Sequence, residues 1–468
     1  MLRYTFFVKF LSFFWILLSF SGICLGQTTP EPAEKLAAGQ VLERVVCAKN
    51  PDQSYALYLP SKYVADRAWP AVFIFDPGAR GKLPVELMRG AAERYGYIVL
   101  GSNNSRNGAW KPEADAADAM LQDAQLRFSV DLKRIYFAGF SGGARVASQL
   151  AQICSCAAGV LLSGAGFSRN SPPSREMPFP VFSAVGLEDF NYSEIIPLQE
   201  NLEQVGYPHW LRVFDGPHQW APAEVMSEAL AWFRMQAMRS NREPRDENLI
   251  STELKAAAGA AERFSSSGDA LTAWRQYKQI ASSYEGISDV KAFRAKADEL
   301  GRTKAVQDAL KRERNDFSDQ DRLSNRILGA LQTDQNPEAP RSQEQSSVLR
   351  DLRDLRQRGE SEKRPERSVV LQRALGGIFI SAIESGGEAL EKKDYGAAAR
   401  YFSAAAEARP NSEGPLRQLA IAQALDKNRR GAAETLRRIK PADPAEFQKW
   451  LAGEPAFQTM REKHELPQ

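Results

Sequence analysis

The pentapeptide Gly139-Phe140-Ser141-Gly142-Gly143 carries a serine hydroxyl between small residues. It directly follows a β-rich apolar run, 134–138, and directly precedes a stretch of helical period that begins at Ala144. At such a strand-to-helix turn the serine sits on a strained bend, and flanking glycines avoid clashes with the neighbouring strand and helix. The free amides and positive dipole end of the helix would face an oxyanion beside Ser141. The pattern predicts a nucleophilic serine, and the alternative is a glycine-rich turn with an inert one.

A serine needs a base to become nucleophilic, and the chain contains 3 histidines. His218 lies in a loop between the last strand candidate, 211–214, and a closing helical run, 223–237. His209 precedes that strand candidate and His464 lies in the C-terminal tail, so both are expected to be surface or packing residues. We therefore expect His218 to be the base, the alternative being a loop histidine without a role.

The base needs a carboxylate that fixes its tautomer, and in chain order this acid is expected between the serine and the histidine. Glu188 and Asp189 follow the strand candidate 181–185. The G-x-x-D spacing from Gly186 favours Asp189, and Glu188 is the alternative.

A second oxyanion donor is expected in the loop 76–81. The backbone amide of Gly78 or Ala79 would pair with that of Gly142 around the developing negative charge. Pro77 is excluded because proline has no N–H group.

Candidate substrate contacts lie in the polar loop 102–108 and among nearby aromatic residues. Arg106 could hold a carboxylate or a sugar hydroxyl with Asn107 beside it, whereas the alternative is that the polar residues only satisfy turn geometry. Aromatic side chains could line an acyl pocket or simply pack in the core. These aromatic residues are Trp110, Phe140, Phe190 and Trp220.

The elements that would position these residues form two regions. Between 54 and 233, short β-rich runs alternate with helical stretches, which is typical of a parallel sheet covered on both faces. Beyond a polar stretch, 240–247, the composition predicts helices only. The strand candidates are 55–59, 71–75, 97–100, 134–138, 159–162, 181–185 and 211–214, and the clearest helices are 85–94, 114–128, 144–152 and 223–237.

The helical region contains a repeat-like pattern. From 386 to 410, small, aromatic and terminating residues fall where a 34-residue tetratricopeptide repeat requires them. The next window continues the pattern less completely, a weaker copy spans 254–284, and the charged stretch 311–367 is interpreted as a spacer. The alternative is a generic helical bundle. The matching residues are Gly386, Tyr395, Ala398, Phe402, Ala405 and Pro410.

Length and net charge limit the number of domains and the classes of binding partner. A chain of 468 residues is too long for one ordinary core, so two or three domains are expected. With 61 basic and 58 acidic side chains the net charge is +3, which supports neither nucleic-acid nor anionic-lipid binding.

The first 26 residues have the layout of a secretory signal, with basic residues, an apolar run, 10–20, and then small residues. Cleavage after Gly26 would give an exported, periplasmic or secreted protein without a membrane span; an uncut anchor and a lipoprotein through Cys24 are the alternatives. An oxidising compartment would let Cys47 pair with Cys154 or Cys156, whereas the other interpretation is three buried thiols.

Together, these residues make 54–233 resemble the α/β-hydrolase superfamily, nearest to its dienelactone-hydrolase-like and polyhydroxybutyrate-depolymerase-like esterases. The resemblance covers a little under half of the chain. It implies an eight-stranded sheet, a triad of Ser141, Asp189 and His218, an acyl-enzyme intermediate and no cofactor. Those esterases usually have a His-Gly pair where this chain has Asp76-Pro77, so the oxyanion loop departs from the pattern.

The sequence thus predicts an exported serine hydrolase that cleaves small-molecule or polymer esters without a metal or cofactor, with helical repeats that bind a protein partner. A catalytically silent scaffold acting as a repeat-based binding module and a serine peptidase on the same fold stay open as alternatives. The predicted segments are a signal peptide, 1–26; a catalytic domain, 40–238; a linker, 239–252; a repeat-like segment, 253–332; a charged spacer, 333–368; tetratricopeptide-like repeats, 369–446; and a tail, 447–468.

Overall fold

The computed structural model describes residues 36–176, 179–333 and 341–466. The predicted signal peptide, 1–26, lies outside the described residues, and so does part of the predicted spacer, 333–368. Residues Ala37–Gln468 form one compact unit that contains both the sheet and the helices that follow it.

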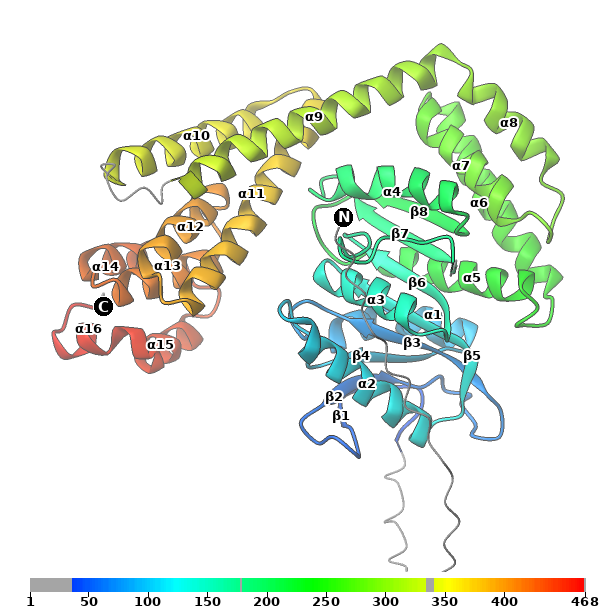
Figure 1. Ribbon diagram of the computed structural model, residues 1–468, viewed down its shortest axis with the longest axis horizontal. Helices are drawn as coiled ribbons and strands as arrows, with labels where there is room; N and C mark the ends of the chain where they lie inside the picture. The colour runs from blue at the N-terminus through cyan, green and yellow to red at the C-terminus, as the bar shows by residue number, and fades with distance from the viewer. Residues whose placement is uncertain (1–35, 177–178, 334–340, 467–468) are drawn as a thin grey trace, which may run out of the picture. The chain divides into compact units, whose positions relative to one another are not determined.

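An eight-stranded, mostly parallel sheet forms the first region (Figure 1), as the resemblance implies. Its strand order is β1-β2-β4-β3-β5-β6-β7-β8, with β2 antiparallel to both of its neighbours and all later neighbours parallel. The strands are β1 (Val41–Val46), β2 (Ser54–Tyr58), β3 (Trp69–Phe75), β4 (Ile98–Ser102), β5 (Val130–Phe140), β6 (Ala157–Ser163), β7 (Val181–Gly186) and β8 (His209–Phe214).

All seven strand candidates are strands in the structure, and the edge strand β1 is an addition. Its sequence, VLERVV, has two charged residues and is only partly buried. Three of its six residues are exposed, so β1 lacks the continuous apolar run of strands that are buried on both faces.

Helices cover both faces of the sheet. Ala184 and Val185 are neighbours on β7 but belong to different apolar clusters, and successive side chains on a strand point to opposite faces. The cluster of Ala184 contains residues of α1 and α5, whereas that of Val185 contains Ile195 and Ile196 of α4. The helices of this region are α1 (Lys82–Tyr95), α2 (Trp110–Arg127), α3 (Gly142–Ile153), α4 (Tyr192–Val205) and α5 (Ala223–Arg239).

The second region contains helices only in its described residues, which agrees with the predicted fold class. The stretch between α5 and α6 is shorter than the predicted linker, 239–252, because α6 already begins at Glu247. The helices are α6 (Glu247–Ser266), α7 (Ala270–Ser283), α8 (Lys291–Gly301), α9 (Lys304–Thr333), α10 (Arg341–Ser361), α11 (Pro365–Glu391), α12 (Tyr395–Ala408), α13 (Glu413–Leu425), α14 (Arg429–Arg438), α15 (Pro444–Gly453), the short 3-10 helix η1 (Pro455–Phe457) and α16 (Gln458–Glu462).

The first helices of this region continue the core of the sheet region. Ile280 of α7 belongs to the same apolar cluster as Trp232 and Phe233 of α5, and the Trp232 indole N–H donates to the Ser283 hydroxyl at 3.2 Å. In the predicted repeat at 386–410, a Cβ at Gly386 would lie 2.7 Å from the Phe402 ring, so small and aromatic positions do meet there. The assignment to the tetratricopeptide class stays a prediction.

Helix α11 is long and apolar enough to cross a membrane by length and composition alone, with a mean hydropathy of 1.2 over its most apolar 18-residue window. Half of that window is buried inside the protein. Leu375 and Ile378 of α11 pack in one apolar cluster with residues of α9, α10 and α12, so its apolar character is explained by packing.

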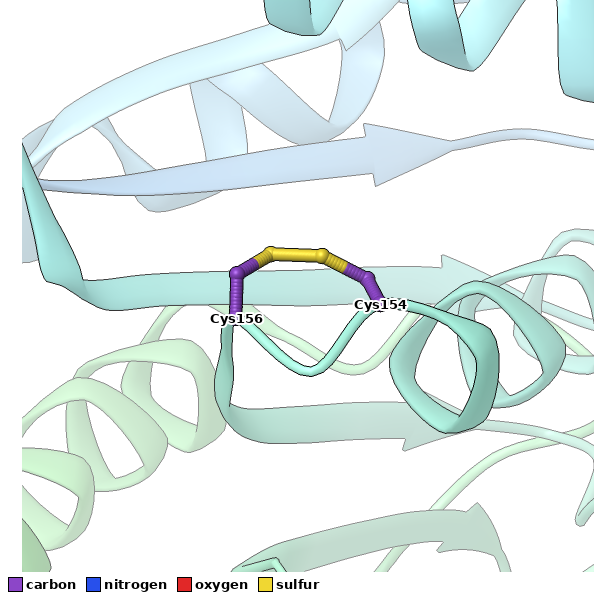
Figure 2. The surroundings of a disulfide bond; sticks show 2 residues. All are labelled: Cys154 and Cys156. Atoms are coloured by element: carbon purple, nitrogen blue, oxygen red, sulfur yellow. A yellow bond between two sulfur atoms is a disulfide. The ribbon is translucent and has the colours of Figure 1, made fainter. Parts of the chain in front are cut away.

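The cysteines pair differently from the prediction. Cys154, after α3, forms a disulfide with Cys156, before β6 (Figure 2), and Cys47 is a buried free thiol. Cys47 follows β1 at the edge of the sheet, and β1 and β6 are five positions apart in the strand order. At about 4.8 Å for each position, the separation is about 24 Å, far beyond the reach of a disulfide.

Candidate active site

Ser141 occupies the predicted bend between β5 and α3. Its backbone has φ 53° and ψ −122°, a left-handed conformation that is strained for a residue with a side chain. A Cβ at Gly139 would lie 2.0 Å from the Gly143 carbonyl oxygen, and one at Gly143 would lie 2.1 Å from the Phe75 carbonyl oxygen. Strand and helix therefore approach so closely that only glycine fits on either side of the serine.

The three predicted triad residues lie together. The His218 Nε2 atom is 2.9 Å from the Ser141 hydroxyl, and its Nδ1 atom is 2.9 Å from each carboxylate oxygen of Asp189. The side chain of His218 is 7% exposed and that of Asp189 is 0% exposed. Glu188, the alternative acid, is exposed, and its backbone N–H donates to the Gly216 carbonyl.

Aromatic rings pack around the imidazole. The Phe140 and Phe190 ring centroids lie 4.6 Å and 4.4 Å from that of His218. Trp220 packs on Phe140 at 5.6 Å, and its indole N–H donates to Asp76 at 2.8 Å. Of the four aromatic candidates, Trp110 and Phe190 line the cavity beside Ser141, whereas Phe140 and Trp220 are buried and do not. Phe140 packs directly against the imidazole, and Trp220 packs against Phe140.

The loop after β3 does not supply the predicted second oxyanion donor. The Gly78 amide donates to the Asp76 carboxylate at 2.8 Å, and the Ala79 amide donates to the Asp76 carbonyl at 3.1 Å. Both predicted donors are therefore turned into their own loop. The Gly78 amide is held by the fully buried Asp76 carboxylate, which also accepts from Arg80 and Trp220. Burial raises the Asp76 pKa, but these hydrogen bonds outweigh it and hold that pKa below its ordinary value.

Gly142, the third predicted donor, opens α3 directly after the nucleophile. The side chain of Asn107 lies against it, because a Cβ at Gly142 would be 1.8 Å from the Asn107 Oδ1 atom. Asn107 is held by its backbone N–H, which donates to the Pro77 carbonyl at 3.0 Å, and by its side-chain amide, which donates to Glu384 at 3.3 Å. Besides His218, the start of α3 and the Asn107 carboxamide are thus polar groups that lie next to Ser141 in the chain or line the same cavity.

In the loop 102–108, the first half satisfies turn geometry and the second half lines the cavity beside Ser141. The Ser102 hydroxyl accepts from the amides of Asn104 and Ser105, so the first half satisfies turn geometry. Buried Glu113 accepts from the Ser105 hydroxyl at 2.6 Å and from the Arg106 amide at 2.7 Å, and burial raises the Glu113 pKa. The second half, with Arg106 and Asn107, lines the cavity beside Ser141 as predicted.

This cavity has a volume of ≈ 740 Å³ and a strongly polar wall. Arg145 of α3 makes a bidentate ion pair with Glu194 of α4, in which its Nη1 and Nη2 atoms lie 2.9 Å and 2.7 Å from the two carboxylate oxygens. The sequence analysis missed this pair because its partners lie 49 residues apart. The opposite wall comes from α11, which contributes Ser381, Glu384, Glu388 and their neighbours. The sequence gives no signal that a helix of the second region lies over the nucleophile.

The other histidines lie elsewhere. His209 borders a separate cavity of ≈ 290 Å³ together with residues of α4 and α7, and its Nδ1 atom is 2.9 Å from the Tyr207 carbonyl oxygen. Burial lowers the His209 pKa. His464 is exposed after α16. Within residues 36–176, 179–333 and 341–466, no group of three or more His, Cys, Asp or Glu side chains could hold a metal ion.

No family model matches this chain, and no curated protein matches it. Solved structures that resemble it include an esterase from Pyrobaculum calidifontis (16% identity, 43% of this chain, 86% of the other, TM-score 0.36). Another is S-formylglutathione hydrolase from Staphylococcus aureus (14% identity, 39% of this chain, 90% of the other, TM-score 0.33). A third is the feruloyl esterase module from Clostridium thermocellum (16% identity, 41% of this chain, 86% of the other, TM-score 0.34). Such similarities decide nothing about activity, which has to be inferred from the site.

Proposed function

We propose that this protein is a serine hydrolase that cleaves carboxylic esters through an acyl-enzyme intermediate on Ser141. The observation that carries the proposal is the continuous hydrogen-bonded chain from the Ser141 hydroxyl through both ring nitrogens of His218 to the buried carboxylate of Asp189. This is the arrangement of nucleophile, base and orienting acid that activates a serine.

In the first half-reaction, the Ser141 oxygen attacks the ester carbonyl carbon while His218 accepts the hydroxyl proton on Nε2. Asp189 stabilises the resulting imidazolium. The tetrahedral intermediate then expels the alcohol, which takes that proton from His218, and the acyl group stays on Ser141. In the second half-reaction, His218 deprotonates a water molecule, which attacks the acyl-enzyme and releases the carboxylic acid.

The oxyanion of each tetrahedral intermediate needs hydrogen-bond donors. We assign one to the Gly142 amide, because it belongs to the first residue of α3, where the free N–H groups and the positive end of the helix dipole lie. Since the single N–H groups of Gly78 and Ala79 donate within their own loop, we assign the second contact to the NH₂ group of Asn107 beside Gly142, which has one N–H left besides the one it donates to Glu384. A single donor of this kind contributes about 10²-fold to 10³-fold in kcat.

A catalytically silent scaffold would not need the strained backbone at Ser141 or a complete triad, which favours an active enzyme over that alternative. The cavity does not separate esters from peptide amides, because the same triad can cleave both. We place esters first on the resemblance of the sequence to esterases, and the serine peptidase is the second candidate.

The proposal is tested with purified protein that begins after the signal-like segment. We expect hydrolysis of p-nitrophenyl acetate or butyrate, and a fluorophosphonate probe should add its mass to Ser141 in the wild type but not in Ser141→Ala. Short peptide p-nitroanilides, assayed in parallel, distinguish a peptidase. If the wild type shows neither hydrolysis nor labelling, the protein is not a serine hydrolase and the scaffold alternative is favoured.

We further propose that the protein is exported and that the repeat-like helices bind a protein partner. The signal-like segment, 1–26, and the disulfide between Cys154 and Cys156 support export, since disulfides persist in oxidising compartments. Fractionation of the native host, with intact-mass analysis of the mature N-terminus, tests the location. The partner proposal has the repeat pattern as its support.

A further inference from the structure

The loop that carries Asp189 is held from two sides. On the sheet side, backbone amides of the loop serve as donors: Leu187 donates to the Phe214 carbonyl at 2.8 Å, and Glu188 donates to the Gly216 carbonyl at 3.0 Å. On the other side, two carbonyls of the loop accept from helices of the second region. The loop of Asp189 is therefore hydrogen-bonded to the end of β8 and the residues after it on one side, and to α9 and α11 on the other.

Arg373 of α11 makes the first of these contacts. Its Nε atom donates to the Leu187 carbonyl at 2.7 Å, although the two residues are 186 positions apart in the chain. The residue is 5% exposed, and its guanidinium lies 3.6 Å above the ring of Tyr192. Burial lowers the Arg373 pKa, while the nearby carboxylates of Glu313 and Asp316 act in the opposite direction. A buried guanidinium is costly unless it is well partnered, and this one is partnered by the acid loop and its flanking helix.

Gln320 of α9 makes the second contact. Its side-chain amide donates to the Phe190 carbonyl at 2.7 Å and to the Ser193 hydroxyl at 3.2 Å. Its own carbonyl oxygen, Oε1, is buried and has no hydrogen-bond partner among the described residues. Arg373 and Gln320 thus donate to the carbonyls of Leu187 and Phe190, which lie before and after Asp189 in the chain.

Phe190 connects α11 with the base itself. One contact of its ring is the imidazole of His218, with centroids 4.4 Å apart. Another is α11, where Cβ atoms added at Gly376 and Gly377 would lie 3.8 Å and 3.4 Å from Phe190. These are ordinary van der Waals distances, so the backbone of α11 lies directly against Phe190 at these two positions.

We propose that the second region is a working part of the active site, in which Arg373 and Gln320 are positioning residues that fix the Asp189 loop and, through Phe190, the imidazole of His218. This inference rests on the proposed serine hydrolase function. Triads work only when their members are held within about 0.5 Å of the productive geometry, and a displacement of about 1 Å can cost about 10²-fold in rate. Loss of either donor frees one end of the loop.

The test compares three variants of the full chain. Arg373→Met removes the donor but keeps most of the side-chain volume, and Arg373→Lys restores a charged donor. The control is Arg356→Met on α10, where Arg356 binds the Glu407 carbonyl at 3.2 Å and the Glu360 carboxylate at 2.9 Å, within the helical region. Steady-state kinetics with p-nitrophenyl acetate gives kcat and KM separately, and a thermal melt reports on stability.

We expect Arg373→Met to lower kcat about 10-fold to 100-fold, with KM changed less than about threefold and the rate of fluorophosphonate labelling lowered in parallel with kcat. Arg373→Lys should recover part of kcat, and Arg356→Met should stay within about twofold of the wild type. A folded Arg373→Met with wild-type kcat would overturn the inference, and so would an equal loss of kcat in Arg356→Met. If Arg373→Met does not fold, Gln320→Leu replaces it with the same expectations.

Failure of the proposed function gives a different result, because the wild type itself would then neither turn over substrate nor be labelled. The positioning contacts can still be measured by amide hydrogen exchange across 187–191. We expect faster exchange in this loop in Arg373→Met than in the wild type and in Arg356→Met. Unchanged exchange would show that α11 does not hold the loop.

Discussion

Replacing Asp189 with asparagine tests the catalytic account at its most buried point. The change keeps the shape of the side chain but replaces one acceptor oxygen with an NH₂ donor. In the structure, the carboxylate accepts from the Asn191 amide at 2.8 Å and from the Nδ1 atom of His218 at 2.9 Å. If the remaining oxygen stays with the Asn191 amide, the new NH₂ group faces Nδ1. That nitrogen must then be an acceptor, so the ring proton moves to Nε2, which can no longer accept the proton of Ser141.

The expected loss follows from this tautomer. An imidazole held with its proton on Nε2 cannot serve as the base, and such a loss is of the order of 10⁴-fold in kcat, or about 5.5 kcal/mol of transition-state stabilisation. Stability should change little, because asparagine fills the same space and both hydrogen-bonded contacts can still form.

The assay is the hydrolysis of p-nitrophenyl acetate, with fluorophosphonate labelling of Ser141 as a second measure of its nucleophilicity. Glu188→Gln is the matched control, because it makes the same chemical change one residue away on an exposed side chain. We expect the control to remain within about twofold of the wild type. The reasoning is refuted if folded Asp189→Asn keeps kcat within about tenfold of the wild type, or if the control loses as much.

Three further predictions follow from contacts around the triad. Gly139→Ala places a methyl group 2.0 Å from the Gly143 carbonyl oxygen, so we expect the free energy of unfolding in urea to fall by about 3 kcal/mol or more. An unfolding midpoint equal to that of the wild type would contradict the close approach. Asn107→Leu should lower kcat about 10²-fold with a smaller change in KM, and an unchanged kcat would place the second oxyanion contact elsewhere. The pKa of Asp76 is held below its ordinary value, since burial raises it but hydrogen bonds from a guanidinium, the Trp220 indole and a backbone amide lower it more. This carboxylate therefore contributes stability that is present above pH of about 4 and is lost as the pH falls towards its lowered pKa. The urea midpoint of Asp76→Asn should therefore fall less between pH 5 and pH 3 than that of the wild type. An equal fall of the two midpoints would contradict this.

Local patterns in the sequence were enough to predict the sheet and the bend at the nucleophile. The central strands are continuous apolar runs because both of their faces are buried, and Gly139 and Gly143 mark a turn that only glycine permits. Chain order was sufficient to select Ser141 and His218 as candidates and to narrow the acid to Glu188 or Asp189, and the structure places Asp189 on His218. Backbone periodicity and steric limits act over a few residues, so they are written directly in the sequence.

The tertiary structure alone decided which groups face the serine. The Gly78 amide turns inward because it donates to the buried Asp76 carboxylate, which also accepts from the indole of Trp220, 144 residues further along the chain. Likewise, Arg373 reaches the acid loop across 186 residues, and α11 forms a wall of the cavity. Such contacts depend on how separate segments pack, and a hydrogen bond between them leaves no periodic signal in either segment. The sequence by itself selected the candidate nucleophile, its base and two possible acids, whereas only the tertiary structure decided between those acids and determined, through the packing of the second region onto the acid loop, what surrounds the site.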